Sequence, residues 1–270
     1  MINYIKGELF RISKLSSFRI LCLLIFICES LYFFVGYKFY METGTLFMGG
    51  EIIPVFIVFM QLVAPFMLMG FVDYSFGDEL KKNTVVRGIE ASYTRTEIYF
   101  MKTVTVYITS LMTLFATIIL AIVAHKILFP DFVIAWTNII ISIKFFGILI
   151  LILSFFLALY SLFYLVIPVS RGFVYTFLYI IALYFHKIIN HIFEFFHLSS
   201  WTEYIGYLPS ALLEKFKIAI VIKMGLDSIH YDSTQFFDQS LLLRIIVSLG
   251  FTILCTIFGV ILFQKKDFTK

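Results

Sequence analysis

Four residues near position 190 are the ones best suited by type to bind a metal ion. They are His186, His191, Glu194 and His197, and imidazole nitrogens and carboxylate oxygens are common zinc ligands. If they lie on one helix, His191 points well away from His186 and His197, which leaves only a partial ligand set. The sequence therefore predicts no metal site here.

Motifs for catalysis are absent from the sequence. There is no G-x-x-x-x-G-K-[ST] phosphate loop, so the chain cannot hydrolyse ATP by that route, and there is no H-E-x-x-H metalloprotease motif. Cys22, Cys28 and Cys255 all fall within apolar runs, where a cysteine usually serves as a small buried hydrophobe. We therefore expect no catalytic residue and no cofactor bound by this chain.

Two polar side chains interrupt apolar runs and are candidates for a substrate path or a gate. Glu29 lies near the middle of the first run, and Gln61 lies in the second. A charge at the centre of a bilayer costs about 2.5–3.5 kcal/mol on insertion scales, so Glu29 is expected to face protein or water. The alternatives to a role in a path or gate are that Glu29 makes a protonated or paired contact between helices, or that it lies closer to the outer interface.

The composition indicates an integral membrane protein. Hydrophobic residues make up 61% of the chain, aromatic residues make up 19%, and the mean hydropathy is +0.99. Continuous apolar runs of about 20 residues are typical of membrane-spanning helices, whereas barrel strands would alternate. Six runs meet this length, and we expect a single all-α domain over residues 1–270. The runs are 19–37, 51–72, 103–124, 140–167, 172–190 and 241–263.

The distribution of lysine and arginine predicts the orientation. Positive charges concentrate near the N-terminus, in residues 77–102, at Arg171 and at the C-terminus. Because cytoplasmic loops are enriched in such residues, both termini are expected in the cytoplasm, with residues 191–240 outside. The chain would then be a multi-pass protein of the cell membrane.

The first 18 residues are expected to form an interfacial helix. One helical face carries the apolar residues and the other is assigned the charged ones, which is typical of a helix that lies flat on a membrane. The apolar set is Ile2, Ile5, Leu9 and Ile12, and the charged set is Lys6, Glu8, Arg11 and Lys14.

A charged segment stands between the second and third runs. Residues 77–102 read GDELKKNTVVRGIEASYTRTEIYFMK and contain nine charged residues. A short helix here would place Val86, Ile89 and Tyr93 on one face, fit either for a lipid surface or for a groove on a soluble partner. Acidic residues are mixed with the basic ones, which favours protein docking over lipid binding.

This segment is similar to the one that follows the second helix of ABC type-2 exporter permeases. In that family a Glu is followed by Gly-Thr, and later by Ser-Arg, an apolar residue and a Lys that opens the third helix. Asn83 replaces the family's Gly, and Ser92 stands where a Pro is common. The amphipathic start, six runs and long last outer loop extend the resemblance over the whole chain. The matching positions are Glu79, Thr84, Arg95, Ile98 and Lys102.

The resemblance implies an export permease driven by a separate subunit. Residues 74–100 would be the coupling loop, which docks on a cytoplasmic ATP-binding subunit that holds ATP and Mg. The docking residues would be Glu79, Thr84, Val86, Ile89, Tyr93 and Arg95. The chain would pair with a second copy or a related permease in a bacterial plasma membrane, would bind no nucleic acid, and would move lantibiotics, bacteriocins or other amphipathic peptides, as in antimicrobial peptide resistance. The alternatives are a sensor or assembly subunit that does not transport, and an enzyme acting within the membrane.

Overall fold

The computed structural model describes most of the predicted helices of this chain. The described residues are 2–43, 63–64, 66–77, 93–129, 136–166, 184–196, 205, 207–211 and 239–265; of these, 136–146, 148 and 239–241 are described by their backbone alone. Within these ranges the regular structure is helical and no strand occurs, in agreement with the expected all-α fold.

Four helices are long and apolar enough to cross a membrane, and they correspond to the first, third, fourth and sixth predicted runs. The second and fifth runs fall largely outside the described residues, so the layout with six crossings stays a prediction. The four candidate spans are α2 (Ser16–Thr43), α6 (Arg95–Leu128), residues Leu149–Val166 of α7 (Trp136–Val166) and residues Leu242–Lys265 of α11 (Gln239–Lys265).

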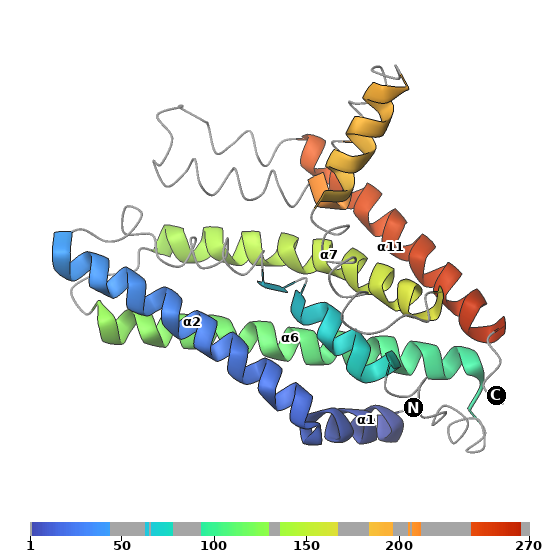
Figure 1. Ribbon diagram of the computed structural model, residues 1–270, viewed down its shortest axis with the longest axis horizontal. Coiled ribbons are helices and arrows are strands. Elements are labelled where there is room, and N and C mark those ends of the chain that lie inside the picture. Colours follow the sequence, from blue (N-terminus) through green and yellow to red (C-terminus); the bar gives the residue numbers. More distant parts are fainter. Residues whose placement is uncertain are drawn as a thin grey trace.

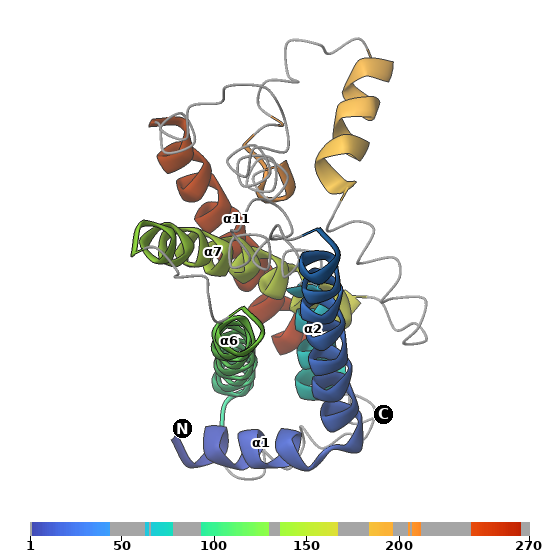
Figure 2. The same ribbon diagram turned by 90° about the vertical axis from the view of Figure 1, so that its left-hand side faces the viewer.

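Helix α1 (Ile2–Lys14) lies across one end of the bundle, below the ends of α6 and α2 (Figure 2). The expected N-terminal helix is therefore present, but the assignment of Glu8 to its polar face is wrong. Glu8 is 7% exposed and is buried together with Ile12. Ile5, Glu8 and Ile12 are spaced so that they share one face, and this face packs on the bundle.

Each long helix runs either away from α1 or back toward it (Figure 1). We call the end that α1 covers the α1 end, and the other the opposite end. α2 and α6 run away from the α1 end, and α7 and α11 run toward it. α2 and α6 meet at the opposite end, where the rings of Tyr37 and Tyr40 lie 6.0 and 5.6 Å from the ring of Phe129.

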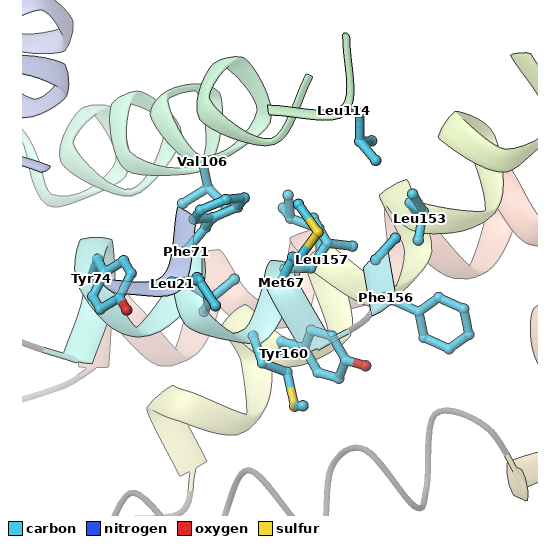
Figure 3. Packing of buried hydrophobic residues seen from close by; sticks show 14 of the residues in the cluster. Leu21, Met67, Phe71, Tyr74, Val106, Leu114, Leu153, Phe156, Leu157 and Tyr160 are labelled. Atoms are coloured by element: carbon cyan, nitrogen blue, oxygen red, sulfur yellow. The ribbon is translucent and has the colours of Figure 1, made fainter. Parts of the chain in front are cut away.

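The core is built around the helical residues 66–72, which continue into a π-helical turn, η1 (Asp73–Gly77). Phe71 from this segment lies beside Val106 of α6, and Met67 lies beside Leu157 of α7 (Figure 3). The exposed surfaces of α2 and α11 are apolar as well. In the most apolar 18-residue stretch of each helix, 61% of the α7 residues are buried but only 17% of the α11 residues. Helix α7 is therefore central, and α11 presents most of its apolar surface outward. Such a surface suits contact with lipid chains rather than water.

Replacing a core phenylalanine should destabilise the fold far more than replacing an outward-facing one. Phe156 is 0% exposed and Phe258 is 55% exposed. Phe156→Ala should lower the free energy of unfolding by about 3–5 kcal/mol, because it removes packed atoms and leaves a cavity. Phe258→Ala should change it by less than about 1 kcal/mol, since lipid or detergent chains can fill the vacated space. Thermal unfolding of the purified variants in detergent measures both, and equal losses would contradict this packing.

Candidate functional site

Glu8 begins a polar cluster at the α1 end. Its carboxylate oxygen Oε2 accepts a hydrogen bond of 2.8 Å from Nη2 of Arg11, which lies about one helical turn further along α1. The same Nη2 donates to the backbone oxygen of Tyr74 at 2.8 Å. Arg11 therefore joins α1 to the turn η1. Its planar guanidinium presents several donors at once, which is what one cation needs in order to serve two acceptors.

Lys102 supplies the second cation of the cluster from α6. Its side chain is fully buried, and Nζ donates to the backbone oxygen of Ser75 at 3.0 Å. Nζ also lies 4.0 Å from Oε2 of Glu8. A buried ammonium group is costly unless it is paired and hydrogen-bonded, and Lys102 has both kinds of partner. We call Glu8, Arg11 and Lys102, with the carbonyls of Tyr74 and Ser75, the polar clasp.

The turn η1 provides the carbonyl acceptors of the clasp. The last carbonyls of a helix have no partner within the helix and carry partial negative charge, so cations bind there favourably. The Tyr74 hydroxyl donates to the backbone oxygen of Ser17 at 2.9 Å and so fixes the turn against α2. Gly77 closes the turn, and a Cβ there would collide with Oδ1 of Asp73 and lie 3.0 Å from the ring of Tyr164. A larger residue at this position would therefore force the Asp73 carboxylate to move.

Three aromatic rings lie next to the clasp and join three segments. Phe76 of η1 packs 5.6 Å from Tyr99 of α6 and 6.5 Å from Phe263 of α11, and Tyr99 lies 5.7 Å from Phe263. We call these three residues the aromatic triad. Gly259 of α11 gives room for it, because a Cβ at this position would overlap the Tyr99 hydroxyl. The end of η1 and the start of α6 are therefore held together by buried aromatic surface.

The first turn of α6 is fixed by its own caps and by α11. Thr94 and Glu97 form a reciprocal capping box, which satisfies two of the free amides at the helix start. Arg95 Nη1 donates to the backbone oxygen of Gln264 at 2.6 Å, and Gln264 Nε2 donates to the Thr96 hydroxyl at 2.7 Å. The ring of Tyr93 meets that of Tyr4 on α1 edge-on at 5.7 Å.

Of the six predicted docking residues, the structure places Tyr93 and Arg95. Both lie at the α1 end, but both make contacts within the chain: Tyr93 with α1, and Arg95 with the end of α11. The other four, which are Glu79, Thr84, Val86 and Ile89, lie outside the described residues.

The clasp was not foreseen as a site, although Lys102 matched the family pattern. The signal was a lysine within the apolar part of a helix, seven residues after Arg95 and therefore on the same face. Glu8 gave a second signal, since it lies between Ile5 and Ile12 at helical spacing. Neither residue alone identifies its partners.

Glu29 is buried in α2, as expected for a membrane glutamate, with 4% of its surface exposed. Glu29 is one of the residues that line a pocket of about 360 Å³ between α2 and α6. The other proposed path residue, Gln61, lies outside the described residues.

Among the described residues, no group of three or more His, Cys, Asp or Glu side chains is placed to hold a metal ion. In the helical residues 184–195, His191 Nδ1 lies 3.4 Å from Oε2 of Glu194, and Asn190 Nδ2 donates to Oε1 of Glu194 at 2.6 Å. His197 lies outside the described residues.

The buried charges of the clasp should depend on one another. Glu8→Gln removes the carboxylate that Arg11 and the buried Lys102 share, and should cost about 3–5 kcal/mol of stability. Lys102→Met alone should also destabilise, but the double variant should lose clearly less than the sum of the two, because the unpaired lysine is then gone. Lys6→Met on the exposed side of α1 is the matched control and should have little effect. Thermal unfolding in detergent gives the four values, and additive losses would show that Glu8 and Lys102 do not interact.

No protein-family model matches this chain, and neither a curated protein nor a solved structure matches it. The function proposed next therefore rests on the chain's own residues, on the geometry of the α1 end, and on the resemblance of its short motifs.

Proposed function

We propose that this chain is the membrane-spanning permease subunit of an ATP-driven ABC exporter. In this proposal the α1 end faces the cytoplasm, residues 74–100 form the coupling loop, and a separate cytoplasmic subunit binds and hydrolyses ATP with Mg. A second copy of the chain, or a related permease, completes the transport path. The substrate is an amphipathic or antimicrobial peptide, or a lipid-like molecule, and this chain itself catalyses no reaction.

The observation that carries the proposal is how the charged segment is attached to the bundle. The clasp and the triad hold η1 at its start, and the caps of α6 hold its last part. Phe76 lies just before the segment and Tyr99 lies near its end, with their rings 5.6 Å apart. Both attachments are at the α1 end. A force applied to the part of the segment between η1 and α6 would therefore reach α1, α6 and α11 together, as a coupling element requires.

The direction of the helices supports a further crossing in the proposed layout. α7 and α11 both run toward the α1 end. Two successive crossings in the same direction require the chain between Val166 and Gln239 to return to the opposite end. A fifth crossing over the apolar run 172–190, with residues 191–240 outside, satisfies this requirement and places both termini on the cytoplasmic side.

Cysteine labelling from outside the cell tests the orientation. Single cysteines are introduced at Ser228 and Asn83 in a chain whose Cys22, Cys28 and Cys255 are replaced by serine. An impermeant maleimide should modify position 228 in intact cells and position 83 only after the membrane is opened, because lysine and arginine favour the cytoplasmic side. The reverse pattern would overturn the orientation and, with it, cytoplasmic docking.

Ile89→Asp tests docking on the ATP-binding subunit. An apolar anchor at the centre of a small interface typically contributes about 2 kcal/mol or more, so this change should abolish co-purification of the ATPase and peptide export while membrane insertion stays normal. Lys82→Glu is the control and should matter little, since an exposed ion pair is worth about 0–1 kcal/mol. Wild-type co-purification by Ile89→Asp would contradict the coupling-helix assignment. Normal docking of the wild-type chain without any export would favour a sensor subunit.

A further inference from the structure

The carboxylate of Glu29 is buried without a hydrogen-bond partner among the described residues. Only 4% of the residue is exposed. Both of its carboxylate oxygens are buried, and neither has a hydrogen-bond partner among the described residues. A carboxylate that is removed from water and left unpaired is costly, so buried charges in membrane helices are usually matched by an opposite charge or used in function. Glu29 therefore lacks a partner that its surroundings would be expected to supply.

Glu29 borders a pocket that is otherwise mostly apolar. The pocket has a volume of about 360 Å³, which lies within the usual range for small-molecule sites. Phe33, Phe34 and Tyr37 of α2 form one wall, and α6 forms the other through Ala124, Ile127 and Leu128. Aromatic faces next to a carboxylate favour a cation, because the π-electrons attract positive charge.

The pocket opens on the lipid-facing surface of the bundle. Phe34 and Ile127, one on each wall, are 62% and 70% exposed. Since these helices are candidate membrane spans, we expect the mouth to face hydrocarbon rather than water. An occupant that enters from the bilayer can therefore keep an apolar part in the lipid while its polar group reaches Glu29.

No positive charge of the described chain neutralises the pocket. Glu29 is the one charged residue among those that line it. The next cation along α2 is Lys38, whose exposed Nζ lies 3.9 Å from Oε1 of Glu42. Lys38 is nine residues from Glu29, or about 14 Å along the helix axis. His125 is next to the lining residue Ala124 in sequence, but its ring packs 5.6 Å from Phe129. Among the described lining residues, none carries a charge that could pair with Glu29.

We propose that this pocket is a membrane-accessible binding site for an organic cation, an ammonium or guanidinium group carried on an apolar body. Glu29 pairs with the cation, the aromatic wall of α2 covers it, and the apolar body lies between Phe34 and Ile127 toward the lipid. As a binding site it is independent of the proposed export function. As a statement about which molecules are exported, it rests on that function.

Binding of dodecylammonium to the full chain in phosphatidylcholine nanodiscs tests the site, with no ATPase present. Saturable binding is expected, and the uncharged dodecanol should compete at least about tenfold less well. Glu29→Gln should weaken dodecylammonium binding by about tenfold or more. Glu42→Gln, the same change at an exposed position of the same helix, should leave it unchanged. Displacement of dodecylammonium by a Leu/Lys amphipathic peptide would indicate that the natural ligand is a cationic peptide. Failure of the peptide to displace it would indicate that the natural ligand is a small cationic amphiphile.

A second variant keeps the test decisive if Glu29→Gln is poorly folded. Ile127→Trp fills the pocket from the exposed face of α6 without touching the carboxylate or the core, and it should also abolish saturable binding. Equal binding of dodecylammonium and dodecanol would show an apolar groove without a cation site. Undiminished binding by a folded Glu29→Gln, or by Ile127→Trp, would overturn the proposal. Because these measurements need neither ATP nor a partner, their failure is separable from failure of the export function.

Discussion

One carboxylate, that of Glu8, allows a buried lysine and a partly buried arginine to lie close together at the α1 end. Lys102 is fully buried in an apolar helix, and the guanidinium of Arg11 shares the same space. Without Glu8 the two positive charges would repel each other in surroundings of low dielectric constant, where such repulsion is strong. With Glu8, each cation has a carboxylate partner and a carbonyl of η1. The clasp is therefore a unit: Glu8 contacts both cations, and each cation contacts a carbonyl of η1.

The clasp determines which segments move together. Arg11 binds η1 to α1, Lys102 binds η1 to α6, and the aromatic triad adds the end of α11. The hydrogen bonds and ion pairs fix the register of these segments because they are directional. The aromatic rings add buried apolar area, which stabilises the contact but constrains its direction less. Interfacial helix, turn and bundle thus form one body at this end. An amphipathic helix that merely rests on lipid would not need a buried glutamate.

Apolar run lengths were sufficient to predict the long helices, because a run of about 20 continuous apolar residues has few structural alternatives to a membrane-spanning helix. They were not sufficient for α1, where periodicity correctly predicted the helix but misplaced Glu8. A glutamate on an apolar face looks like an error in the pattern until its partner is known, and that partner, Lys102, lies far away in the chain. The same limit applies to Lys102, whose acceptor on Ser75 is 27 residues away. By contrast, burial of Glu29 follows from the cost of a lipid-exposed charge, a property of one residue.

The clasp and the Glu29 pocket are linked because the same two helices build both. α6 has 34 residues, about 50 Å at 1.5 Å per residue, and it carries Lys102 near one end and the pocket wall near the other. α2 likewise runs from Ser17, which is bound to η1, to the Glu29 wall. Long helices are stiff, so a change in the angle between α2 and α6 at the clasp would shift the two pocket walls relative to each other. A cation held between those walls resists such a shift, and by reciprocity any event that tilts the helices at the α1 end changes how tightly the cation is held.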